Sequence, residues 1–153
     1  MEQKGSMLLK VVSIIMMIGG IVSAVASFFV AIFAGLGQAV VAANGDEINA
    51  ALEASGYGSV AAPVMALVWV GVVIIIAGAV FEIIAGVTGK KNWNNPAAAQ
   101  GMMILGIVCA ALSLVSNILF ATGGLGVQIV SILSGMVLPV LYIVGTIQLK
   151  KQA

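Results

Sequence analysis

Glu82 is the one charged side chain that lies well inside a long apolar stretch of this sequence. Polar groups are costly in lipid, so an acid at this position is expected to point into the protein. About 12 Å of helix separates Glu82 from Lys90, which places the acid below the membrane surface and short of the midplane. Three roles stay open: a hydrogen bond to a neighbouring helix, a site for a proton or cation, or extension toward the surface.

Tyr142 is the expected partner of Glu82. Glu82 precedes the pair Lys90-Lys91 by the same eight positions that separate Tyr142 from Lys150-Lys151. If the two helices run in the same direction, the two side chains should lie at the same depth. A phenol can donate a hydrogen bond to either protonation state of a carboxyl group. We therefore predict a hydrogen bond from Tyr142 to Glu82.

Small and polar residues recur at four-residue spacing on three apolar stretches. This spacing puts them on one helix face, where small residues let membrane helices approach and hydroxyl or amide groups bond across helices. A pore lining would need several charged or amide groups along the whole path, and none is visible. The predicted packing seams are Gly78, Glu82 and Gly86, then Cys109, Ser113 and Asn117, then Ser131, Gly135 and Pro139.

The residues needed for common enzyme chemistry are missing from the sequence. It has no His, and its single cysteine, Cys109, cannot form an internal disulfide. It also has no CxxC motif, glycine-rich phosphate loop or pair of neighbouring acids within an apolar stretch. We therefore expect neither enzymatic activity nor a cofactor or metal. With a net charge of +1 and no cluster of basic residues along one face, nucleic acid is not an expected partner.

Composition predicts an all-α membrane protein. The chain of 153 residues is 62% hydrophobic and 7% charged, against about 25% charged in soluble domains. Its apolar stretches exceed the roughly 18 residues that mark a spanning helix. We expect a single membrane domain over residues 1–153, a four-helix transmembrane bundle of two hairpins. The expected spans are approximately 7–36, 64–88, 97–121 and 127–149, with an outer loop over 37–62.

The first apolar stretch has one rival interpretation. Lys4 and Lys10 precede it, and Ala24-Val25-Ala26 resembles a signal-peptide cleavage site. The apolar character continues to Leu36, however, and cleavage would remove half of a spanning helix. The pattern favours a membrane span.

Lysine placement predicts the orientation. If the four helices alternate in direction, all six lysines fall on one side of the membrane, and this side is expected to be the cytoplasm. Both termini are then cytoplasmic. The opposite side carries residues 46–53, where early acids and a following glycine predict a short helix, either a covering segment or a partner-binding one.

Several segments resemble a known group of proteins. They are residues 81–89, Asn95-Pro96, the region 106–116 and residues 138–145. In these the chain is similar to small uncharacterised four-transmembrane-helix proteins of Gram-positive bacteria. The resemblance implies a multi-pass protein of a bacterial plasma membrane, and that group has no established activity to carry over.

The functional expectation follows from these points. We expect a non-enzymatic protein that binds the lipid bilayer and a membrane-protein partner or a second copy of itself, as a scaffold, accessory subunit or toxin-immunity factor. The alternative is a small transporter or channel that uses Glu82. A transporter needs water access to the acid, and a scaffold does not.

Overall fold

The computed structural model of the protein describes residues 6–56, 61–120 and 129–152, with side chains for all of these except 52, 61–65, 119–120 and 129–134. All regular structure in these ranges is helical, as the composition predicted. The helices are α1 (Met7–Ala43), α2 (Gly45–Ala54), α3 (Ala61–Asn92), the 3-10 turn η1 (Pro96–Ala98), α4 (Ala99–Phe120) and α5 (Ile129–Lys150).

Three of these helices are long and apolar enough to cross a membrane: Met7–Ala43, Ala66–Asn92 and Pro96–Ile118. Gly135–Lys150 is a shorter apolar helix within the described residues. Together they are consistent with a helical membrane bundle. The predicted limits at residues 121 and 127 lie outside the described residues.

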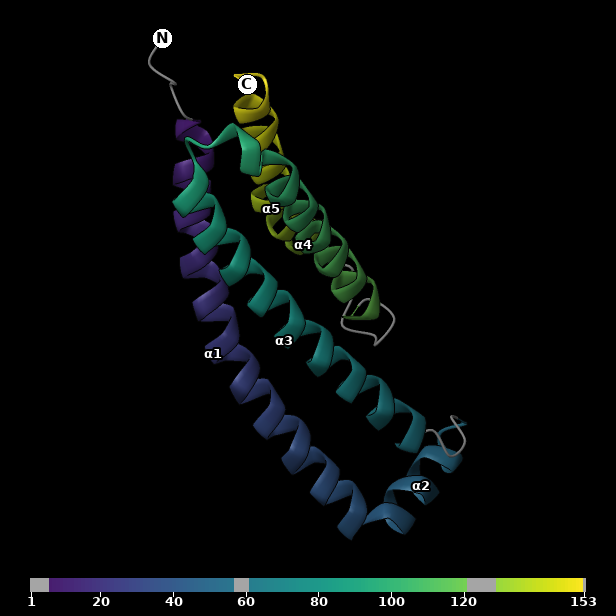
Figure 1. The fold of residues 1–153 in the computed structure, drawn as a ribbon. Coiled ribbons are helices and arrows are strands. Elements are labelled where there is room, and N and C mark those ends of the chain that lie inside the picture. The colour runs from purple at the N-terminus through teal and green to yellow at the C-terminus, as the bar shows by residue number, and fades with distance from the viewer. Residues whose placement is uncertain (1–5, 57–60, 121–128, 153) are drawn as a thin grey trace.

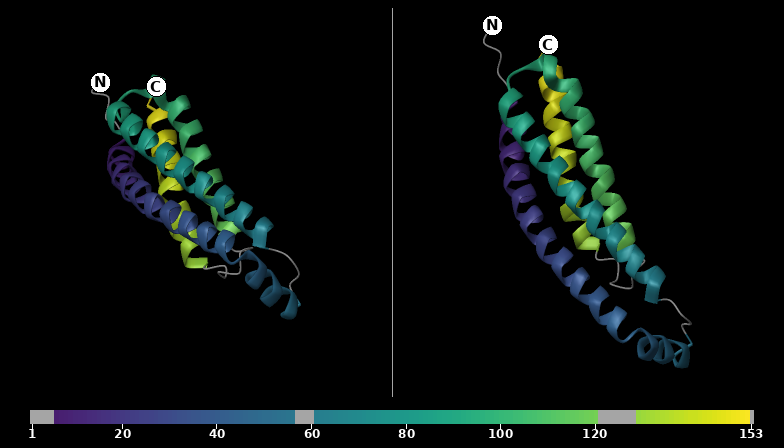
Figure 2. Two further views of the ribbon diagram at one scale, coloured as in Figure 1. Left: turned by 90° about the horizontal axis from the view of Figure 1, so that it is seen from below. Right: turned by 60° about the horizontal axis from the view of Figure 1, so that its bottom comes forward.

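The four long helices form a closed ring (Figures 1 and 2). α1 packs along α3, α3 against α4, α4 against α5, and α5 back against α1. The first hairpin is therefore α1 with α3, and the second is α4 with α5. The largest buried side chains belong to the half of the ring near the termini, among them Leu9, Met16, Met102, Tyr142 and Leu149.

Glycines bring the helices together in this half. A Cβ added at Gly86 would lie 2.6 Å from the backbone nitrogen of Met17, so α1 and α3 touch backbone to backbone. At Gly145 an added Cβ would lie 3.0 Å from the Cα of Leu9, which joins α5 to α1. Small residues permit this close approach in membrane bundles, where packing replaces the hydrophobic effect between helices.

The end of the bundle that carries the termini is held by contacts between separate segments. The amide of Ser6 donates to the carbonyl oxygen of Trp93 at 3.0 Å, and the Ser6 hydroxyl is 3.5 Å from Oε1 of Gln148. The Lys10 ammonium lies 4.6 Å from the centroid of the Trp93 ring, a cation–π contact. Figure 1 shows both ends of the chain and the α3–α4 connection at this end.

The outer segment differs from the prediction in its first part. α1 continues past residue 36 to Ala43, because Gly37 and Gln38 are followed by alanines and valines that extend the helix. The helix ends at Asn44, whose amide and side chain both donate to the carbonyl of Val40.

The short helix predicted over residues 46–53 is present as α2, with Asp46 and Glu47 in its first turn. Past its end, Gly56 adopts φ +79°, and its amide donates to the carbonyl of Glu53. A left-handed residue of this kind is a common helix stop and suits glycine.

Candidate functional site

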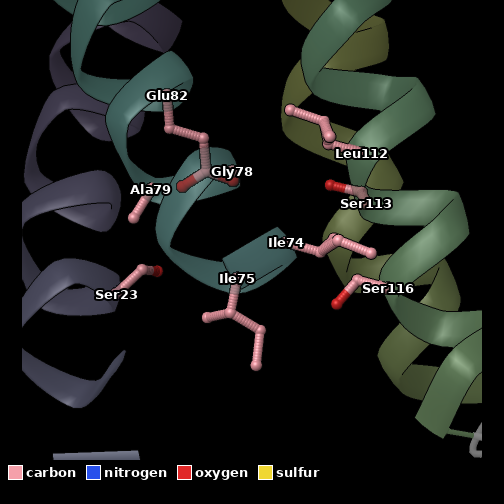
Figure 3. A pocket seen from close by; sticks show the side chains of 9 residues that line it. All are labelled: Ser23, Ile74, Ile75, Gly78, Ala79, Glu82, Leu112, Ser113 and Ser116. Atoms are coloured by element: carbon pink, nitrogen blue, oxygen red, sulfur yellow. The ribbon is translucent and has the colours of Figure 1, made fainter. Parts of the chain in front are cut away.

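The side chain of Glu82 lines a cavity of about 130 Å³ between α1, α3 and α4. Figure 3 shows its carboxylate turned along α3 toward Gly78. The side chain is half-buried rather than displayed on the outer surface of the bundle. Of the three roles that the sequence left open, this placement is compatible with two: a hydrogen bond to a neighbouring helix, and a site for a proton or cation.

Three hydroxyl groups share the cavity with the carboxylate. Ser23 reaches it from α1, while Ser113 and Ser116 reach it from α4. The remaining walls are formed mainly by Ile74, Ile75, Ala79 and Leu112. The cavity therefore has oxygen atoms from three helices set in apolar walls.

Gly78 helps to create this space, which differs from its predicted role. A Cβ added at Gly78 would meet no atom within 4 Å, so no helix packs closely there. At Gly86, two turns further along α3, the added Cβ would meet the backbone of α1. The stripe was predicted as one packing seam, and it is in fact a contact at one end and a cavity at the other.

The predicted hydrogen bond between Tyr142 and Glu82 is wrong. The Tyr142 hydroxyl is fully buried and donates instead to the carbonyl oxygen of Ala85 at 2.9 Å. The ring also lies at the level of Gly89, where an added Cβ would be 2.7 Å from it. The prediction assumed that equal distances to a Lys-Lys pair mean equal depth. The helices are instead shifted along their axes, so Tyr142 meets a level of α3 nearer to the termini.

The other predicted seam residues have varied roles. Cys109 is buried in the core, and Pro139 is buried inside α5. Asn117 donates to the carbonyl of Ser113 on its own helix at 2.7 Å, and a Cβ at Gly135 would be 3.7 Å from the Asn117 amide nitrogen. These contacts place Asn117 and Gly135 where α4 meets α5. The side chain of Ser131 lies outside the described residues.

Several other polar side chains bond within their own helix. Ser13 donates to the carbonyl of Leu9, Ser27 to that of Ser23 and Thr146 to that of Tyr142. Each bond spans four residues and satisfies a hydroxyl that lipid could not solvate. The cavity serines differ from these. The hydroxyl groups of Ser23, Ser113 and Ser116 form no hydrogen bond with any described residue.

Sequence reasoning missed Ser23 and Ser116 as neighbours of Glu82. The spacing of Gly19, Ser23 and Ser27 on α1 is a signal of the same kind as the predicted stripes, and it would have singled out Ser23. Ser116 precedes Asn117 by one position and lies off the predicted stripe. It joins the cavity because α4 presents a broad face to α3.

Among the described residues, the Glu82 carboxylate is the one acidic group that lines the cavity, and no lysine lines it. Lys10, Lys90, Lys91 and the Lys150-Lys151 pair lie at the helix ends near the termini, and the chain has no Arg or His. Across the described ranges no three His, Cys, Asp or Glu side chains come together in a way that could hold a metal ion. The site offers one anion and several neutral oxygen atoms.

The fold and this site define a helical protein whose apolar helices are long enough to cross a membrane, with one half-buried acid that lines an open cavity between three of them. No family model matches the chain, and neither a curated protein nor a solved structure matches it.

Proposed function

We propose that the chain is a multi-pass protein of the plasma membrane, which it crosses four times with both termini in the cytoplasm. The described lysines at the end that carries the termini support this orientation, because loops rich in lysine stay on the cytoplasmic side. The acids Asp46, Glu47 and Glu53 of α2 lie at the opposite end. The resemblance to small membrane proteins of Gram-positive bacteria favours a bacterial plasma membrane.

Within this membrane, the protein acts without enzymatic chemistry by binding another membrane component, as a scaffold, accessory subunit or toxin-immunity factor. The observation that carries the proposal is the unequal length of the two hairpins. α1 has 37 residues and α4 has 22. At 1.5 Å per residue these lengths are about 55 Å and about 33 Å, and a hydrocarbon core is about 30 Å thick.

The described part of α4 therefore matches one membrane thickness, and among the described residues the first hairpin extends past the second at the α2 end. A tilt of about 40°, the upper end of the usual range, still leaves α1 about 42 Å tall. Apolar side chains continue into this extension, including Val40 on α1 with 56% of its surface exposed and Leu67 on α3 with 59%. Lipid tails do not cover such side chains beyond the hydrocarbon core, so a protein partner is favoured.

The extension has a defined internal structure. The indole nitrogen of Trp69 on α3 donates to Oε1 of Gln38 on α1 at 2.8 Å. Tryptophans prefer the membrane interface, so this bond marks the level at which the two helices leave the lipid. The residues beyond it on both helices form the proposed partner-binding end.

A photocrosslinking amino acid can distinguish a protein partner from lipid at the exposed apolar side chains. Placed at Val40 in living cells, it should yield a discrete protein adduct. Placed at Ile107, which is 52% exposed on the side of α4, it should not. An adduct of twice the 15.4 kDa chain mass would identify the partner as a second copy. If both positions give the same lipid-only pattern, the proposal is refuted.

The cavity at Glu82 favours a second candidate, a small transporter or channel. A carboxylate that faces a cavity is the one feature of the described residues that could take up a transported ion. In liposomes containing the purified protein, this candidate requires a proton or cation flux that Glu82→Gln abolishes. The scaffold proposal expects no such flux.

A further inference from the structure

We propose that the cavity around Glu82 is a binding site for a small monovalent cation such as Na⁺, held by the carboxylate and by the hydroxyl groups of Ser23, Ser113 and Ser116. This inference deepens the second candidate function, which uses the same carboxylate, but binding itself requires neither transport nor a protein partner.

The first support is the set of oxygen atoms. Small hard cations prefer oxygen ligands, and a serine hydroxyl has lone pairs that can accept a cation. The carboxylate and the three hydroxyl groups line the same cavity and come from three different helices (Figure 3). No described residue forms a hydrogen bond with these three hydroxyl groups. The hydroxyls of Ser13 and Ser27 on α1 differ, because each donates to a carbonyl of its own helix.

The second support is the size of the cavity. A volume of about 130 Å³ is much larger than a bare cation. It has room for several water molecules beside the ion. A cation can therefore enter with part of its hydration shell and complete its coordination with water.

The third support is the balance of charge. An ionised carboxylate near apolar walls is unfavourable unless a positive charge neutralises it. The closest lysine along α3 is Lys90, about 12 Å further along the helix. One monovalent cation neutralises Glu82, whereas a divalent ion would leave an unpaired positive charge in lipid. The charge balance therefore selects against Mg²⁺ and Ca²⁺.

The fourth support is the depth of Glu82 in the membrane. Along α3, Glu82 lies about 20 Å from Trp69 and about 16 Å from Trp93. If these two tryptophans mark the two membrane interfaces, the acid lies near mid-depth. Attraction between opposite charges is stronger beside apolar side chains, where the dielectric constant is low, than in bulk water, so a cation here would be held more firmly than at the surface.

The test is binding of radioactive ²²Na⁺ to the purified full-length protein in detergent micelles. Wild-type protein should bind one Na⁺ saturably, and unlabelled Na⁺ or Li⁺ should displace it while choline and Mg²⁺ should not. Glu82→Gln should weaken binding at least tenfold. Glu53→Gln is the matched control, because it removes a carboxylate from exposed α2 and should bind like the wild type.

Four results would overturn the proposal: no saturable binding to the wild type, displacement by Mg²⁺ as effective as by Na⁺, unchanged binding in Glu82→Gln, or loss of binding in Glu53→Gln. If Glu82→Gln does not fold, Ser113→Ala takes its place, since it keeps the acid and removes one hydroxyl. The Ser113→Ala variant should bind Na⁺ several-fold more weakly than the wild type. An unchanged affinity for Na⁺ would also overturn the proposal. A protein that passes these tests but yields no crosslink at Val40 would retain the cation site and lose the partner-binding proposal.

Discussion

The contact between α1 and α3 can be tested with two glycines on the same helix, Gly86 and Gly78. Replacing either by alanine gains helix propensity, about 1 kcal/mol in a helix interior. At Gly86 the new Cβ would lie 2.6 Å from the backbone nitrogen of Met17 and 2.7 Å from the carbonyl oxygen of Ser13. Ordinary contact begins near 3.4 Å, so the two helices must separate by several tenths of an ångström or more.

Backbone atoms cannot rotate out of the way as a flexible side chain would, so this strain falls on the whole α1–α3 interface. Overpacking of a well-packed site typically costs about 1–3 kcal/mol and occasionally more. After the gain in propensity, Gly86→Ala should lower the free energy of unfolding by about 2 kcal/mol. Gly78→Ala meets no atom within 4 Å, and it should leave that free energy unchanged or raise it by up to about 1 kcal/mol.

The assay is unfolding of the purified variants by sodium dodecyl sulfate in mixed micelles, followed by helical circular dichroism and by tryptophan fluorescence. The two variants should differ by about 2–3 kcal/mol, with Gly86→Ala unfolding at clearly lower detergent fraction. Equal stability of the two variants would show that α1 and α3 do not meet at Gly86. Marked destabilisation by Gly78→Ala would show that the cavity beside Glu82 is filled.

Two further outcomes are expected. With Cys109 replaced by serine, single cysteines at Ser55 and Asn94 should differ in intact cells: an impermeant thiol reagent should label the first and not the second, and the reverse pattern would invert the proposed topology. Tyr142→Phe removes the bond to the carbonyl of Ala85, and the average value for such bonds in membranes predicts a loss of about 0.6 kcal/mol in the same unfolding assay. A loss well above about 2 kcal/mol would mean that the Tyr142 hydroxyl has a role beyond this bond.

The helices themselves could be predicted from the sequence. Apolar stretches of 20 or more residues predict helices in lipid, because only a helix satisfies its own backbone hydrogen bonds there. The end of α2 was also predictable, since acids at the start of a segment and a glycine after it act locally. The lysines at one end of the bundle follow from helices that alternate in direction.

The bounds of α1 were less predictable. Gly37 and Gln38 gave a local reason to end the helix, yet it continues to Ala43. α1 packs along α3, and the bond from Trp69 to Gln38 connects the two helices beyond the predicted end. Tertiary contacts of this kind outweigh a weak local preference.

The candidate site, like the helices, was only partly predictable from the sequence. The sequence by itself identified Glu82 as the acid that must face inward, because the cost of a charge in lipid depends only on the apolar residues around it. Only the tertiary structure decided that Ser23 and Ser113 join it, and that Tyr142 bonds to Ala85 instead. Contacts between helices depend on their axial shift and rotation, which are set by the combined packing of side chains from all four helices. Distances counted along one helix carry no information about that shift.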